Sequence, residues 1–176
     1  RRRLHVNGYV HDETKNSGVE QTRIVVVGHV DHGKSTLIGR LLHDVGALPP
    51  GKVEAVEEMC RRRGMTFEWA FVTDALQAER DQGITIDVSY VRFVVSGRSF
   101  VLTDAPGHRQ FIRNMISGAA GADGALLVID AGEGIGDQSR RHAHLLHILG
   151  VHQVVVAITK MDIVHHDGGR FAEVER

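Results

Sequence analysis

The sequence predicts a mostly parallel, doubly wound α/β sheet with helices on both faces, and three observations support this fold class. Apolar runs rich in β-branched residues alternate with segments of helical periodicity. The runs at 23–27, 125–129 and 154–158 lack the alternation of a half-solvated strand, as is typical of strands covered on both faces. Glycines such as Gly46 and Gly150 end the helical patterns. In this fold class, ligands bind at the carboxyl ends of the strands.

Local signals predict the elements between these strands. Apolar residues at helical spacing predict a helix over 37–42 and another over 144–149. The stretch 47–87 is the least regular. It contains a short amphipathic helix at 53–63 and then Asp74, which we expect to cap a second helix running through Arg80. A hairpin follows, with strands at 88–95 and 98–103 joined by Ser-Gly.

Length and composition exclude several classes of protein. A chain of 176 residues supports one compact domain, so we expect a mobile segment at 1–22 and a single domain at 23–176. The formal net charge of −1 creates no overall field toward nucleic acid or an anionic membrane. No apolar run approaches the roughly 20 residues of a bilayer span, and the first residues lack the apolar stretch of a signal peptide. We therefore expect a cytoplasmic protein without a membrane partner.

Residues 28–35 read GHVDHGKS, which matches G-x-x-x-x-G-K-[ST] between a predicted strand and a predicted helix. In such a loop the backbone N–H groups and the helix N-terminus surround a di- or triphosphate. Lys34 would reach the outer phosphates, and the Ser35 hydroxyl would bind Mg²⁺. The loop therefore predicts nucleotide contacts by His29, Val30, Asp31, His32, Gly33, Lys34, Ser35 and Thr36.

Two further motifs follow predicted strands. Asp104 ends the strand at 98–103, where a second acid near Mg²⁺ is needed, and the amide of Gly107 can approach a γ-phosphate without a side chain in the way. Beyond the strand at 154–158 lies Thr-Lys-Met-Asp. The carboxylate of Asp162 can accept from both N1–H and the 2-amino group of guanine, while Lys160 can lay its methylene stem along the ring and reach back to the phosphate loop.

Together these stretches resemble translation-factor-type GTPases over most of residues 23–165. The motifs that carry the resemblance are GHVDHGKST (28–36), ERDQGITID (79–87), DAPGH (104–108) and TKMD (159–162). The linking segments STLIGRLLHD, DALQAERDQGITID and DQSRRH resemble the GTP-hydrolysing large subunit of bacterial sulfate adenylyltransferase more than elongation factor Tu or elongation factor 1-alpha. The resemblance implies a P-loop NTPase G domain that binds GTP, GDP and Mg²⁺.

The resemblance also implies roles for individual residues. Thr85 would bind Mg²⁺ in the triphosphate state, which gives the irregular stretch 47–87 a reason to move. His108 would position the attacking water, Gly107 would contact the γ-phosphate, and Thr159, Lys160 and Asp162 would hold the base. Catalysis by Lys34 and His108 would then rest on positioning and electrostatics.

For the whole protein, the resemblance implies a sulfate adenylyltransferase large subunit. Its GTP hydrolysis would drive ATP and sulfate toward adenosine 5′-phosphosulfate on a separate small adenylating subunit. The alternative is an elongation-factor-type GTPase that delivers aminoacyl-tRNA to the ribosome, and only this alternative requires a nucleic-acid partner. The basic groups at 1–3 and 61–63 indicate solvated faces, because no aromatic residues are interleaved with them.

Three positions depart from the family pattern. Thr159 stands where Asn is usual, so we expect the contact that ties the base-reading segment to the phosphate loop to be shorter or lost. His32 is typical of elongation factors, whereas the sulfate-activating subunits often carry Asp there. The chain ends shortly after Asp162, so we expect it to lack the last strand and helix and the downstream β-barrel domains, leaving the strand at 154–158 as an exposed edge.

Overall fold

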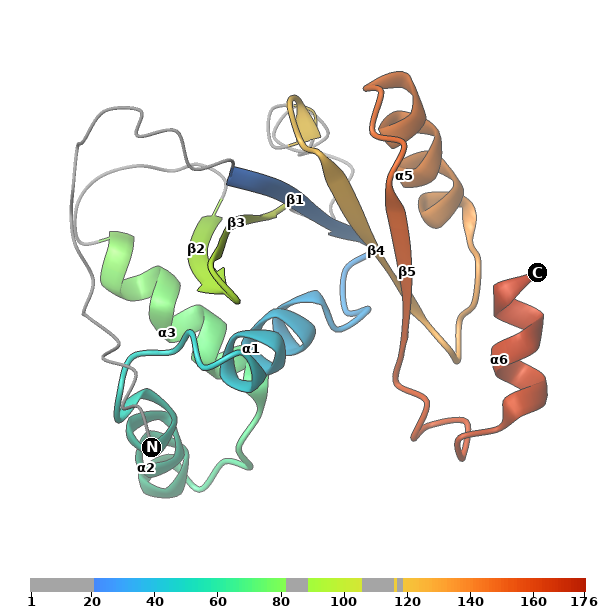
Figure 1. Ribbon diagram of the computed structural model, residues 1–176. Helices are drawn as coiled ribbons and strands as arrows, with labels where there is room; N and C mark the ends of the chain where they lie inside the picture. The colour runs from blue at the N-terminus through green and yellow to red at the C-terminus, as the bar shows by residue number, and fades with distance from the viewer. Residues whose placement is uncertain (1–20, 82–88, 106–115, 117–118) are drawn as a thin grey trace.

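The computed structural model describes residues 21–81, 89–105, 116 and 119–176. Within these residues, five strands form one sheet in the order β2-β3-β1-β4-β5. Its strands are β1 (Gln21–Gly28), β2 (Ser89–Val95), β3 (Arg98–Asp104), β4 (Gly124–Asp130) and β5 (Val154–Thr159). Three strand pairs are parallel, and β2 pairs with β3 as an antiparallel hairpin. The expected mostly parallel α/β sheet is confirmed (Figure 1).

Helices pack on both faces of the sheet, because successive β1 side chains point to opposite sides. Val26 packs with Ile38 and Leu42 of α1 (Lys34–Asp44) and with Leu76 of α3 (Trp69–Asp81). The opposite cluster contains side chains from β1, from α5 (Asp137–Ile148) and from α6 (Gly168–Glu175), namely Val25, Val27, Leu146 and Val174. Each face of the sheet thus has its own apolar cluster, and the carboxyl ends of the strands lie at the edge of the sheet between the two helical layers.

The stretch after α1 is more helical than the sequence pattern indicates. The expected helix at 53–63 is α2 (Lys52–Arg63), which ends at Gly64 in the left-handed conformation. The prediction that Asp74 caps a helix is wrong, because α3 already begins at Trp69. Val72 is buried in a third cluster with Val56 of α2. This packing extends α3 one turn before Asp74.

The last strand and the last helix also differ from expectation. The run at 154–158 is predicted as a core strand, yet Val155 is 66% exposed, and β5 pairs only with β4 in the described structure. This exposure agrees with the separate expectation of an exposed edge. The sequence pattern does not predict α6, whose start is capped by the Asp167 carboxylate accepting from the Gly169 amide. β1 begins at Gln21, and residues 1–20 lie outside the described part of the chain.

Candidate nucleotide-binding site

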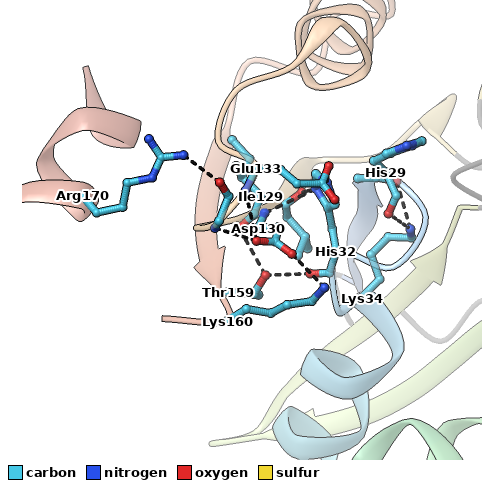
Figure 2. Close-up of polar contacts among 12 residues, drawn as sticks. His29, His32, Lys34, Ile129, Asp130, Glu133, Thr159, Lys160 and Arg170 are labelled. Carbon is cyan, nitrogen blue, oxygen red and sulfur yellow. Dashed lines mark hydrogen bonds and ion pairs between the residues drawn. The ribbon is translucent and has the colours of Figure 1, made fainter. Parts of the chain in front are cut away.

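The loop between β1 and α1 has the geometry of a phosphate cradle. Asp31 and Gly33 adopt φ of 62° and 85°, so two residues in the left-handed region turn the chain sharply before the helix. Lys34 folds back over the loop, where its Nζ donates to the carbonyl oxygens of Gly28 at 2.9 Å and His29 at 2.8 Å. Burial lowers the pKa of Lys34, while the negative charges of Asp104 and Asp31 raise it. These two hydrogen bonds thus fix the Lys34 ammonium against the phosphate loop (Figure 2).

The N-terminus of α1 leaves its backbone donors available. Its N-cap, Gly33, supplies no side-chain hydrogen bond, and the first turn contains no acidic residue. A helix start without such partners presents unpaired N–H groups and the positive end of the helix dipole. This is an anion site suited to phosphate.

Asp104 lies at the end of β3, next to this loop. Its Oδ1 is buried and has no hydrogen-bond partner among the described residues. Burial raises the pKa of Asp104 to about 6, the charge of Lys34 opposes the rise, and the neighbouring carboxylate of Asp74 adds to it. A buried carboxylate oxygen without a partner is an unstable arrangement unless a cation or a donor approaches it. Ser35 lies in the first turn of α1, so the expected pair of Mg²⁺ ligands comes from the end of β3 and the start of α1.

The segment after β5, which the sequence predicts to read the base, joins the phosphate loop through Thr159. Its Oγ1 donates to the His32 carbonyl at 2.6 Å and also faces the Ile129 carbonyl at 3.1 Å. Of the expected outcomes, a shorter or a lost contact, loss does not occur, because the hydroxyl reaches the loop directly (Figure 2). Gly33 lies against the Thr159 side chain, and its φ of 85° is in the left-handed region that favours glycine.

Lys160 and Asp162 lie in the turn after β5. The Lys160 ammonium contacts Asp130 at the end of β4, with Nζ 2.7 Å from Oδ2, rather than reaching back to the phosphate loop as expected. Asp162 is exposed. No hydrogen bond of its carboxylate is found within the described part of the chain, so that acceptor is available to a ligand.

The sequence motifs miss several residues that support this site. His32 is buried, and its Nε2 lies 3.1 Å from Glu133 in the loop after β4. From α6, Arg170 donates to the carbonyl oxygens of Ala131 at 2.7 Å and Gly132 at 3.0 Å in the same loop (Figure 2). No local pattern indicates these contacts, because each joins residues far apart in the chain.

Two other missed residues come from helices. Thr73 of α3 donates through Oγ1 to the Ser35 carbonyl at 2.9 Å, which ties α3 to the start of α1. His142 of α5 is buried, and burial together with the positive charge of Lys34 lowers its pKa to about 4. The spacing of His142 from buried Ser139 and Leu146 is a signal that it faces inward.

The site is therefore built from residues far apart in the chain, and one of its hydrogen bonds joins residues separated by 127 positions. The described residues among the predicted contacts, from His29 to Thr36 and from Thr159 to Asp162, lie on adjoining segments at the carboxyl ends of β1 and β5. Thr85, Gly107 and His108 lie outside the described residues. Their roles stay predictions.

The fold and the phosphate loop define this protein as a P-loop nucleotide-binding domain of the α/β class. A family model described as the Elongation factor Tu GTP binding domain matches residues 20–176. The chain belongs to this family, and it is a GTPase domain of the translation-factor type. Domains of this family are expected to bind GTP and GDP.

Similar proteins are named as elongation factors. The chain is 49% identical over 152 residues to elongation factor 1-alpha of Pyrococcus furiosus, covering 86% of this chain and 35% of the relative. The corresponding protein of Halobacterium salinarum is 43% identical over 152 residues, covering 86% of this chain and 36% of the relative. The chain thus spans about a third of the length of these relatives.

Two solved structures also resemble this chain. A bacterial selenocysteine-specific elongation factor EF-Sec gives a TM-score of 0.60 at 29% identity, covering 88% of this chain and 22% of that one. The elongation factor SelB from Methanococcus maripaludis, in complex with the GTP analogue GPPNHP, gives a TM-score of 0.55 at 26% identity. That match covers 88% of this chain and 25% of the other.

These relatives overturn the expectation of a sulfate adenylyltransferase large subunit and, with it, the expected small adenylating subunit. The segments that favoured that prediction lie largely in α1, α3 and α5. His32, which touches the loop after β4, was the feature that pointed to elongation factors.

Within the described residues, no helix is long and apolar enough to cross a membrane.

Proposed function

We propose that this chain is the GTP-binding and GTP-hydrolysing domain of a translation elongation factor that delivers aminoacyl-tRNA to the ribosome. The observation that carries the nucleotide part is the direct hydrogen bond from Thr159 to the His32 carbonyl, which supports a site shared by the phosphate loop and the turn after β5. The names of the relatives support the translation part. Work at the ribosome would place the protein in the cytoplasm, as the sequence predicts.

The site suits a magnesium ion held with the nucleotide. Mg²⁺ prefers oxygen ligands and usually retains several waters. The buried, unpartnered Oδ1 of Asp104 and the hydroxyl of Ser35 supply such oxygens, and Thr85 is the further ligand that the resemblance implies. When bound, the ion would neutralise charge on the outer phosphates. The chain's own contribution is to hold the phosphates with Lys34 and the donors that begin α1.

Guanine recognition would come from the turn after β5. The Asp162 carboxylate can accept two hydrogen bonds from guanine, a pair that adenine does not offer. Adenine would leave this acceptor without its hydrogen bonds, and a site built to make such bonds discriminates strongly against a ligand that lacks the donors. Calorimetry tests this directly, because we expect tight binding of GDP with Mg²⁺ and much weaker binding of ADP. Equal affinities for GDP and ADP would overturn the assignment.

Hydrolysis would depend on His108 orienting a water for in-line attack on the γ-phosphate, with the Gly107 amide contacting that phosphate. In the full-length protein, His108→Ala is expected to retain GTP affinity and to slow single-turnover hydrolysis by at least about tenfold. Rapid-quench measurements report the rate, and equilibrium titration reports the affinity. A variant that hydrolyses GTP at the unmodified rate would remove His108 from the mechanism.

Ribosomes should identify the biological context. GTPase sites of this type turn over slowly alone, and partners add roughly 10³- to 10⁵-fold. We expect ribosomes programmed with messenger RNA and aminoacyl-tRNA to stimulate GTP hydrolysis by the full-length protein. If the protein binds GTP but ribosomes do not stimulate hydrolysis, the result would contradict a delivery factor and favour a module that only binds nucleotide.

A further inference from the structure

The carboxylate of Asp130 is fixed in place at the end of β4. Its side chain is almost fully buried, at 5% exposure. Oδ1 accepts from the backbone amides of Gly132 at 2.6 Å and Glu133 at 3.3 Å. Oδ2 is left to face the turn after β5, where it lies 2.7 Å from the Lys160 ammonium (Figure 2).

Asp130 and Lys160 each stabilise the charged form of the other. Burial alone would raise the pKa of Asp130, but hydrogen bonds from Lys160 and from the amides of Gly132 and Glu133 outweigh it and hold the pKa below its ordinary value. The hydrogen bond to Asp130 raises the pKa of Lys160. Both groups are therefore ionised at neutral pH, and the anchored carboxylate determines where the mobile cation rests.

Lys160 has other acidic groups within electrostatic range. Asp31 of the phosphate loop and Glu133 also act on its ammonium. Both are exposed, whereas Asp130 is buried and held by two backbone amides. The Lys160 backbone is in the left-handed region, at φ 54°, next to Thr159, which is bonded to the phosphate loop. The Lys160 stem therefore runs between two anchored points.

We propose that Asp130 is a positioning residue for the base of the bound nucleotide. It acts through Lys160, whose ammonium it holds so that the methylene stem lies across the face of the ring. Without Asp130, the ammonium turns toward Asp31 or Glu133, and the stem leaves the base unsupported. This inference rests on the proposed guanine site and names the residue that fixes one wall of it.

A double-mutant cycle tests the inference on the intact chain. Asp130→Asn retains the acceptor for Gly132 and removes the charge, while Lys160→Met retains an unbranched stem and removes the ammonium. We expect Asp130→Asn to raise the Kd for GDP about 3- to 10-fold, and to have no further effect in the Lys160→Met background. Multiplicative effects of the two substitutions would overturn the proposal.

A probe without a base separates positioning from structural damage. We expect Asp130→Asn to leave the affinity for magnesium pyrophosphate unchanged, because that probe uses only the phosphate loop. An equal loss for pyrophosphate and GDP would show damage to the loop and would overturn the proposal. Asp44→Asn is the matched control, since it breaks an exposed ion pair with Arg40 on α1 and should alter neither affinity.

Two outcomes remain distinguishable from these. If the unmodified chain binds ADP as well as GDP, the proposed guanine site itself fails. If it prefers GDP but the cycle is multiplicative, only the role of Asp130 fails. Should Asp130→Asn not fold, as judged by circular dichroism, Asp130→Glu keeps the charge and shifts it by one methylene. Its effect on GDP should likewise vanish in the Lys160→Met background.

Discussion

At the scale of single residues, the site contains a carboxylate whose function works against stability. Asp104 has one buried carboxylate oxygen without a hydrogen-bond partner among the described residues, and burial raises its pKa to about 6. A buried charge without a partner destabilises the folded chain, and a cation bound there would relieve the cost. Occupancy of the site should therefore stabilise the domain.

The pH dependence of stability follows from Asp104. Its folded-state pKa of about 6 lies above the ordinary value of 3.8 for an aspartate, so the folded chain binds this proton more tightly than the unfolded chain. The stability from this group is fully present below about pH 4 and is lost as the pH rises through about 6. Asp104→Asn should therefore stabilise the nucleotide-free chain by up to roughly 3 kcal/mol at pH 7.5, and much less at pH 4.5.

Denaturant unfolding without nucleotide at the two pH values measures this difference. The same difference between variant and unmodified chain at both values would contradict the prediction. Calorimetry with GDP supplies the functional readout. Asp104→Asn should remove most of the dependence of GDP affinity on Mg²⁺, because the carboxylate is one of the proposed ligands.

Asp162 carries the prediction about base choice. Asp162→Asn replaces an acceptor with an amide that can donate to the extra carbonyl of xanthine, so preference should shift from GTP toward XTP by at least about tenfold. Competitive titration with the two nucleotides measures the ratio. Asp137→Asn, an exposed carboxylate at the start of α5, should leave the ratio unchanged. Unaltered selectivity in Asp162→Asn would refute the assigned contact.

At the scale of elements, the contact between α1 and α3 supports the phosphate loop. Gly39 permits it, because a Cβ there would lie 2.3 Å from the Trp69 carbonyl oxygen and 3.1 Å from Thr73 Oγ1. Thr73 in turn bonds the Ser35 carbonyl. A change at the helix contact should therefore reach the first turn of α1.

Gly39→Ala tests this connection. The added methyl must push the two helices apart, so we expect a loss of about 1–3 kcal/mol in the free energy of unfolding. GDP affinity should fall as well, because Ser35 moves with its helix. Gly168→Ala is the control, since no atom lies within 4 Å of a Cβ built there, and its effect should stay within about 0.5 kcal/mol. A Gly39→Ala chain as stable as the control would show that the helices repack freely.

The elements show what sequence could and could not predict. Buried strands are recognisable because a run such as Ile24–Val27 has few alternative structures. The phosphate loop is recognisable because its function requires a local string of residues. The start of α3 at Trp69 is not, because packing against α2 overrides the capping signal of Asp74. The Asp130–Lys160 pair joins the end of β4 to the turn after β5, and no local period in the sequence encodes it.

At the scale of the whole molecule, the strands of the sheet differ in how well they are shielded from solvent and from pairing with another chain. β4 and β1 are covered on both faces and paired on both sides, whereas β5 is an edge in the described structure. Its side chains at Val154, Val155 and Val156 are 42%, 66% and 50% exposed. An exposed apolar edge strand is a template for pairing with another chain.

Val155→Lys should therefore reduce self-association of the 176-residue chain. A lysine on an edge strand opposes edge-to-edge pairing, while the exposed position makes it nearly neutral for folding. Sedimentation velocity over a concentration series measures the effect. Ile148→Lys, which removes a 63% exposed aliphatic residue from α5, is the control. Equal effects of both variants would assign association to general surface hydrophobicity.

The hydroxyl of Thr159 has one hydrogen and two carbonyl neighbours, at His32 and Ile129. Rotation about a single C–O bond moves that hydrogen from the phosphate loop to the neighbouring strand and displaces no heavy atom. The tie between the two halves of the ligand's cradle can thus be released locally.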